Sequence, residues 1–184
     1  NSDGTISEAQ IKWLKEDLEN STAPWKIVVM NKSPYSSGEH IGDPETIALR
    51  KQITDLMYKY RVDLILQGND GVYMRSQPIR AGLNAGSDAN TVKNSAGRMY
   101  VSVLNPLGPI YLNSGPAGAL GSTTVPDSET VKYIPRGAKS VDGTAPMFSA
   151  ITVEGDNLFL DAYAVDGDTL NVIERIAIER GKKQ

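Results

Sequence analysis

The chain has 184 residues, of which 40% are hydrophobic, which is enough for a real core and suits a single globular domain over residues 1–184 or a piece of a larger one. A net charge of −3 and a pI near 5.2 argue against general attachment to nucleic acid or to acidic membranes. The absence of cysteine excludes a disulfide framework, a thiolate metal site and a cysteine nucleophile.

The first third of the chain predicts a helix over about residues 7–20, followed by a βαβ unit. The run Ser7-Glu8-Ala9-Gln10 has the spacing of a helix-capping box, and apolar residues recur at helical spacing after it. Residues 25–30 (WKIVVM) are nearly all apolar, which is typical of a parallel strand covered on both faces. A second helix, which opens with an Asp-Pro-Glu start signal, is predicted over 43–60, and a second buried strand over 62–66.

From Tyr73 onward, short β-rich runs separated by Gly, Asn, Asp and Pro predict an antiparallel half. These runs are 99–104, 109–113, 147–153, 157–165 and 170–178. The tetrapeptides at 154–157 and 165–168 are hairpin-turn signals. The regions at about 80–98 and 114–146 are rich in Gly, Ser, Asn and Pro and predict long loops. The predicted fold class is therefore mixed α/β: a βαβ unit with parallel strands, followed by an antiparallel β-rich half.

Two polar segments follow the two predicted parallel strands, where ligands collect in open α/β sheets. They are Asn31 to His40 (NKSPYSSGEH) and Gly68 to Arg75 (GNDGVYMR). The order QIKWLKEDL, WKIVVMNKSPYSSGEHI, a helix and YRVDLILQGNDGVYMRS resembles the calcineurin-like metallophosphoesterases of the purple acid phosphatase type over residues 7–77. The run 108–118 and the later strands match the same family more loosely. The resemblance implies the second half of the family's β-sandwich, flanked by helices, with an N-terminal half before residue 1.

The same resemblance implies a metal centre whose ligands are missing. The family's signature would be a His at the place of Asn31 and a Gly-His-x-His loop at Gly68 to Gly71, so that Asn31, Asn69 and Gly71 stand where intact members carry metal-binding histidines. In those members, two transition-metal ions of Fe, Zn or Mn activate a water for attack on a phosphate ester. Asparagine offers only a weak carbonyl oxygen and glycine offers no side chain, so we expect this chain to bind no catalytic metal and no other cofactor.

His40 is the only histidine and the remaining candidate catalytic residue. The resemblance implies that it contacts the substrate phosphate or protonates the leaving group, and the alternative is a loop histidine on the surface. Tyr35, Tyr73 and Arg75 are candidates for lining a phosphate pocket, with packing or support of the site as the alternative.

The aspartates are interpreted as structural residues. Asp70 could act as a base, but an exposed turn aspartate is the commoner case. Asp161, Asp166 and Asp168 are close in sequence, and placement in turns or at strand edges accounts for them. None of the four is therefore assigned a role in chemistry.

These observations predict the C-terminal part of a metal-dependent hydrolase of phosphate mono- or diesters, a part that is itself inactive. The alternative is a non-enzymatic scaffold or assembly module, natural or engineered, derived from the same fold. A missing half would expose an apolar sheet edge or face, so we expect a homo-oligomer in the form of a symmetric dimer. No nucleic-acid or membrane partner is expected. The lack of cysteine fits cytosolic and bacterial extracytoplasmic proteins alike, and an extracytoplasmic or secreted bacterial parent is the working expectation.

Overall fold

The computed structural model describes residues 5–80, 83–84, 89–118, 121–130, 132, 134 and 138–181. In chain order its elements are α1 (Glu8–Asn20), β1 (Ile27–Met30), the 3-10 helix η1 (Glu39–Gly42), α2 (Pro44–Lys59), β2 (Leu64–Gln67), β3 (Tyr73–Arg75), β4 (Ile79–Arg80), β5 (Leu83–Asn84), β6 (Ala89–Lys93), β7 (Met99–Leu104), β8 (Ile110–Ser114), α3 (Asp127–Thr130), β9 (Lys139–Val141), β10 (Met147–Glu154), β11 (Asn157–Asp166) and β12 (Thr169–Glu179).

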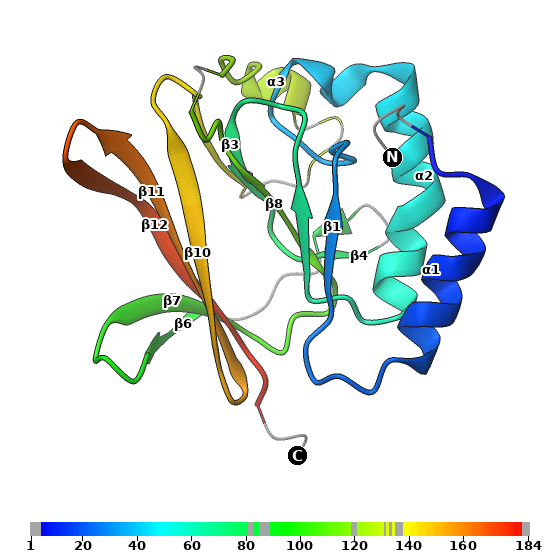
Figure 1. Ribbon diagram of the computed structural model, residues 1–184, viewed down its shortest axis with the longest axis horizontal. Coiled ribbons are helices and arrows are strands. Elements are labelled where there is room, and N and C mark those ends of the chain that lie inside the picture. Colours follow the sequence, from blue (N-terminus) through cyan, green and yellow to red (C-terminus); the bar gives the residue numbers. More distant parts are fainter. Residues whose placement is uncertain are drawn as a thin grey trace.

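Two five-stranded sheets face each other, and α1 and α2 cover the outer side of one of them (Figure 1). The first sheet has the order β1-β2-β8-β3-β9, and the second has the order β10-β11-β12-β7-β6. Strands β1, β2 and β8 run parallel, whereas β3 is antiparallel to both of its neighbours. The mixed α/β class predicted from the sequence is confirmed.

The helices begin where the sequence predicts. The capping box of α1 is present, because Gln10 N donates to Ser7 Oγ at 3.2 Å and Ser7 N donates to Gln10 Oε1 at 3.1 Å. Helix α2 begins at Pro44, although the side chain of the N-cap residue Asp43 makes no capping hydrogen bond. None of the helices in the described ranges is long and apolar enough to cross a membrane.

Two hydrophobic cores share the strands of the first sheet. Ile65 and Tyr111 belong to the core beneath the helices, whereas Leu64 and Leu112 belong to the core between the sheets. Successive side chains of a strand point to opposite faces, so a central strand that serves both cores must be apolar at nearly every position. This requirement explains the unbroken apolar runs of β2 and β8.

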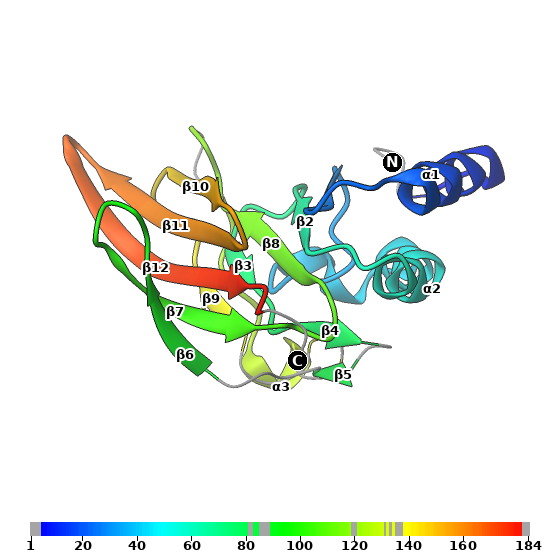
Figure 2. The same ribbon diagram turned by 90° about the horizontal axis from the view of Figure 1, so that it is seen from below.

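Strand β1 lies at the edge of its sheet and is covered on one face only. Val28 and Met30 pack against the core beneath the helices. Ile27 and Val29 point to the other side and stay exposed, Val29 to 75%. The prediction that 25–30 is a strand covered on both faces is therefore wrong for β1. The second sheet contacts β8 through its own edge strand β10 and leaves this side of β1 open (Figure 2).

The sequence predicted that the β-rich half is antiparallel, and this prediction is wrong for two of its strand pairs. Strand β8 pairs in parallel with β2, and β12 pairs in parallel with β7. The short apolar run of β8 is typical of a buried parallel strand, and nothing local in it records which strand it pairs with. The two predicted hairpins are confirmed, because β10-β11 and β11-β12 are antiparallel pairs closed at Glu154–Asn157 and Asp166–Thr169.

The two predicted long loops contain regular structure. The region 80–98 includes β6, and the region 114–146 includes α3 and β9, so these predictions are wrong there. The remainder of both regions lies partly outside the described residues. Strand β6 has little β-propensity of its own and forms by pairing with β7 across a tight turn. In that turn Asn94 Oδ1 accepts from Arg98 N at 2.8 Å, and Gly97 takes a φ of 78°.

Candidate functional site

Three polar segments meet at the carboxyl ends of β1, β2 and β8, at the upper end of the first sheet in Figure 1. Asn31 follows β1, Gly68 follows β2, and Asn113 lies at the end of β8. Gly68 N donates to Asn31 O at 3.0 Å, so the two segments singled out in the sequence lie side by side.

A buried amide network fixes these loops to each other. Asn113 Nδ2 donates to Ser33 Oγ at 2.8 Å and to Gly68 O at 3.2 Å. Ser33 Oγ itself donates to Gly68 O, and Gln67 Nε2 donates to Asn113 Oδ1. Sequence reasoning missed this network. Reading 109–113 as a third parallel strand would have placed the polar residue at its carboxyl end beside the other two segments.

His40 and Asp70 form a pair that runs from the surface into the interior. Nδ1 of His40, on η1, forms a hydrogen bond with Asp70 Oδ1. The His40 side chain is 39% exposed, whereas that of Asp70 is 1% exposed. The hydrogen bond to Asp70 raises the pKa of His40 against the effect of burial, and the negative charges of Asp70, Asp43 and Glu39 raise it further. Asp70 thereby orients the ring and keeps a proton on Nδ1.

The burial of Asp70 contradicts its interpretation as an exposed turn residue. Gly38 lies directly on it, because a Cβ added to Gly38 would stand 2.7 Å from Asp70 Cγ. Asp70 Oδ2 is buried and has no hydrogen-bond partner within the described part of the chain, and the same holds for Ser37 Oγ. Asp70 is buried because the loop that carries Gly38 lies over it, and the sequence does not predict this contact.

The positions of the missing histidines differ in the space around them. Asn31 and Asn69 are exposed, and Asn69 has a left-handed φ of 68°. Gly71 is tightly packed, because a Cβ added to it would lie 2.6 Å from Gly121 Cα. Cβ atoms added to Gly121 or Gly143 would each lie 1.8 Å from Gly71 O. We call these three residues the glycine contact. It leaves no room for a side chain at position 71.

The side chains present do not fit a two-metal centre. Within the described ranges, no group of three or more His, Asp or Glu side chains lies where it could hold a metal ion. Position 71 offers no donor, and positions 31 and 69 offer amides only. A dinuclear centre needs several carboxylate and imidazole ligands, so no step of a metal-dependent reaction can be assigned to this chain's residues.

The three candidate pocket residues lie apart, because Tyr35 and Tyr73 belong to different cores and Arg75 shares a partner with Tyr73. Tyr35 is buried beneath α2, and its hydroxyl is 3.1 Å from Thr54 Oγ1. Tyr73 lies between the sheets and donates to Glu174 Oε1 at 2.6 Å, while Arg75 Nη2 donates to Glu174 Oε2 at 2.7 Å. Burial and the neighbouring Glu174 raise the pKa of Tyr73, so its phenol stays protonated. The structure therefore does not bring these three side chains together with His40.

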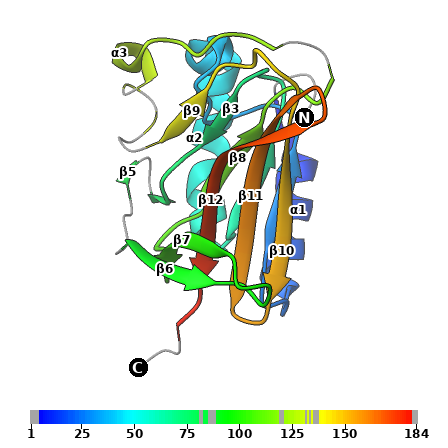
Figure 3. The same ribbon diagram turned by 90° about the vertical axis from the view of Figure 1, so that its left-hand side faces the viewer.

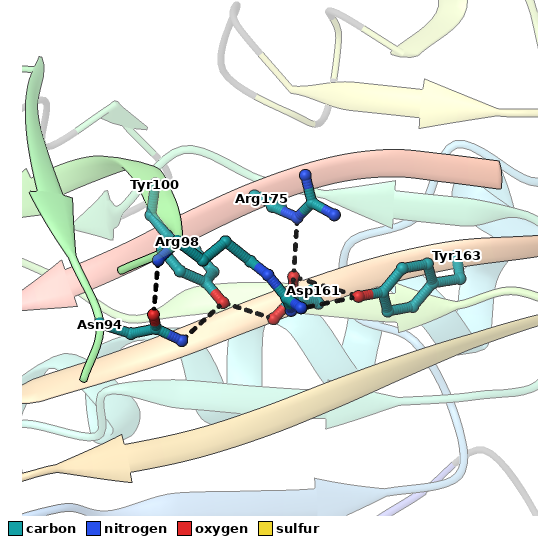
Figure 4. Close-up of polar contacts among 6 residues, drawn as sticks. All are labelled: Asn94, Arg98, Tyr100, Asp161, Tyr163 and Arg175. Carbon is teal, nitrogen blue, oxygen red and sulfur yellow. Dashed lines mark hydrogen bonds and ion pairs between the residues drawn. The ribbon is translucent and has the colours of Figure 1, made fainter. Parts of the chain in front are cut away.

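A second buried carboxylate, Asp161, lies on the outer face of the second sheet (Figure 4). Its Oδ2 accepts from Tyr100 OH at 2.7 Å, and its Oδ1 accepts from Arg175 Nε at 2.9 Å and Arg98 Nη1 at 3.1 Å. Burial raises the pKa of Asp161, but the hydrogen bonds from Tyr100 and Arg175 and the charge of Arg98 outweigh it and lower the pKa. Asp161 occupies the middle of β11, so its interpretation as a turn or strand-edge residue is wrong. The other two aspartates of that group lie at the β11-β12 turn, as interpreted.

No family model matches the chain. It is 29% identical over 115 residues to the Probable purple acid phosphatase 20 of Arabidopsis thaliana, a match that covers 60% of this chain and 22% of that protein. It is 28% identical over 117 residues to the Fe(3+)-Zn(2+) purple acid phosphatase 12 of the same plant, covering 61% and 23%. The chain thus matches less than a quarter of the length of these curated relatives.

The structure is similar to that of the purple acid phosphatase PPD1 from yellow lupin (Lupinus luteus) seeds. The TM-score is 0.74 and the sequence identity 20%, and the match covers 96% of this chain and 29% of that one. The resemblance predicted from the residues is confirmed: the relatives are purple acid phosphatases, and this chain has the fold of one part of such a protein.

Proposed function

We propose that this chain, a metallophosphoesterase-type unit similar to part of the purple acid phosphatases, does not hydrolyse phosphate esters itself. The observation that carries the proposal is the glycine contact. At position 71, Gly121 Cα lies only 2.6 Å from where the Cβ of a metal-binding side chain would stand. The neighbouring positions Asn31 and Asn69 supply only amides, which are poor ligands for the ions named in the Fe(3+)-Zn(2+) relative.

Metal content and turnover, measured on the same sample, test this proposal. The purified chain is incubated with Fe, Zn or Mn salts, desalted and examined by inductively coupled plasma mass spectrometry, and a chromogenic phosphate monoester and diester are supplied as substrates. We expect far less than one ion per chain, and hydrolysis no faster than that of His40→Ala. Stoichiometric metal, or metal-dependent turnover that disappears in His40→Ala, would overturn the proposal.

A second role, as an assembly module, is favoured by the open side of β1. Ile27 and Val29 lie on the face whose neighbours in the sheet build a core, yet both are exposed. An exposed apolar edge strand is a template for pairing with another chain. We propose that β1 pairs with β1 of a second copy about a two-fold axis.

Light scattering after gel filtration tests this assembly. We expect a dimer for the wild type and a monomer for Val29→Lys, because a charge on the paired edge opposes association. Val172→Lys is the matched control, since Val172 is also exposed but lies on β12 in the other sheet, and this variant should stay dimeric. A monomeric wild type at about 100 μM, well above the Kd of a stable dimer, would contradict the proposal.

A further inference from the structure

A groove of about 890 Å³ opens at the end of the first sheet opposite the candidate functional site. Its walls are residues 58–59 at the end of α2, residues 61–63 just before β2, residues 105–109 between β7 and β8, and residues 180–181 after β12. Figure 2 looks at the molecule from this end. A groove of this volume accommodates a ligand of a few residues. We call it the basic groove.

Its rim carries two cations, Lys59 and Arg61, for which the described part of the chain supplies no ion pair, since none of its carboxylates lies within 4.0 Å of either side chain. Arg180, by contrast, is paired with Asp63 at 2.5 Å and stacks on Trp25. The chain as a whole has a net charge of −3, so the positive charge of this rim is opposite in sign to that of the whole chain. Charge complementarity therefore favours an anionic ligand here.

The backbone of Arg61 is unusual. Its φ is 55°, in the left-handed region that favours glycine. Arg61 N donates to Tyr58 O at 3.1 Å and Val62 N donates to Met57 O at 3.0 Å, so this residue closes the end of α2 at a place that is most often glycine. A strained position thus carries a cationic side chain on the wall of the groove.

An apolar lip stands beside these cations. Leu107 is 59% exposed, and it lies in the loop between Pro106 and Pro109. The loop sits tightly against β4, because a Cβ added to Gly108 would lie 2.1 Å from Ile79 O. Two prolines and this close approach hold Leu107 in place, so little conformational entropy is lost when a ligand contacts it.

We propose that the basic groove binds a short acidic peptide segment of another protein that also carries an apolar side chain. Carboxylates of the segment pair with Lys59 and Arg61, and the apolar side chain packs on Leu107. A short peptide engages only this rim, whereas a nucleic acid would extend its negative charge over an acidic protein surface.

Fluorescence anisotropy with a labelled peptide of alternating Glu and Leu tests the proposal. We expect saturable binding at low salt, weakened at least about tenfold by Arg61→Gly combined with Lys59→Gln and severalfold by Leu107→Ser. Arg61→Gly suits the left-handed backbone, so its melting temperature should equal or exceed that of the wild type. Lys51→Gln, an exposed lysine on the same helix, is the matched control and should bind like the wild type.

Three results would overturn the proposal. The first is equal binding of the peptide in which Gln replaces every Glu. The second is a failure of the charge contacts: either the double variant at Lys59 and Arg61 binds the peptide as tightly as the wild type does, or the wild type does not bind the peptide. The third is displacement of the peptide by a single-stranded oligonucleotide of the same charge with equal affinity, which would make the groove a general anion site.

Discussion

Two buried carboxylates in this protein have almost the same exposure and very different surroundings. Counted over all atoms of each residue, backbone included, Asp70 is 6% exposed and Asp161 is 5% exposed. Both oxygens of Asp161 accept hydrogen bonds, from two tyrosines and two arginines. Asp70 has one partner, the half-buried His40, and its second oxygen has none in the described part of the chain. A buried charge stabilises a fold only when its hydrogen bonds offset the loss of water.

The difference follows from where each residue sits. Asp161 lies at the centre of β11, and its donors come from β11 itself, from β12 and from the β6-β7 hairpin. These strands are neighbours in the second sheet (Figure 3), so Asp161 joins three segments across it. Asp70 lies in a turn at the carboxyl end of β2, covered by Gly38 from another loop. We therefore read Asp161 as a group that holds the second sheet together. Asp70 serves His40 and contributes little to folding.

The largest effect should come from Asp161→Ala. Removing this carboxylate leaves Tyr100 and Arg175 without their acceptor, and we expect a loss of about 3 kcal/mol in the free energy of unfolding. The half-exposed Arg98 contributes least, because water can replace its partner. Urea denaturation measures the change. Asp166→Ala, at the exposed β11-β12 turn, is the control and should stay within about 0.5 kcal/mol. Equal effects of the two variants would remove the contrast.

The next effect should come from Gly143→Ala, which tests the packing beside Asp70. The added methyl group would stand 1.8 Å from Gly71 O, so backbone must move, at a cost of about 2 kcal/mol. Gly118→Ala is the matched control, because no atom of the described residues lies within 4 Å of a Cβ there. Thermal denaturation of both variants measures the difference. If Gly143→Ala has the same melting temperature as Gly118→Ala, the glycine contact is looser than the structure shows.

The parts of the fold that could be predicted are those encoded by neighbouring residues. Ser7 and Gln10 are three positions apart, and the capping box they form is local. The hairpin turns at 154–157 and 165–168 likewise need only four residues each. The parallel pairing of Leu64 with Ile110 could not be predicted, because it joins distant residues and neither run specifies its partner.

The candidate site shows the same limit. The sequence placed Asn31 beside Gly68, since both follow parallel strands, and the structure confirms this contact. The burial of Asp70 depends on Gly38, which approaches from a separate loop, and the tight packing of Gly71 depends on Gly121. Both contacts join loops whose paths no local pattern predicts, and so the sequence suggested that Asp70 is exposed.

A smaller effect is expected for Asp70→Asn. The substitution removes a buried charge, one oxygen of which accepts no hydrogen bond in the described part of the chain, and it keeps an acceptor for His40. The free energy of unfolding should therefore change by no more than about 1 kcal/mol. The pKa of His40 should fall toward its ordinary value of 6.5, because the hydrogen bond and charge of Asp70 raise it. The protein has a single histidine, so one proton NMR titration reports this pKa without assignment. A loss of stability as large as that of Asp161→Ala would show that Asp70 is also structural.

The smallest effect is a pH dependence with a defined sign. Folding raises the pKa of His40 above 6.5, so its contribution to stability is fully present below pH 6.5 and disappears as the pH rises through the folded value. The advantage of the wild type over His40→Gln in urea denaturation should therefore shrink as the pH increases. This pH dependence should be much smaller in an Asp70→Asn background, where only the charges of Asp43 and Glu39 still raise the pKa of His40.

For Asp161 the sign is reversed. Its pKa is lowered below 3.8, so its contribution is present above that pH and is lost as the pH falls through the folded value. The two carboxylate sites thus respond in separate pH windows and can be followed in one protein. An advantage over His40→Gln that grows with pH would mean that the His40–Asp70 pair favours the neutral imidazole, and the contrast between the two sites would have to be drawn differently.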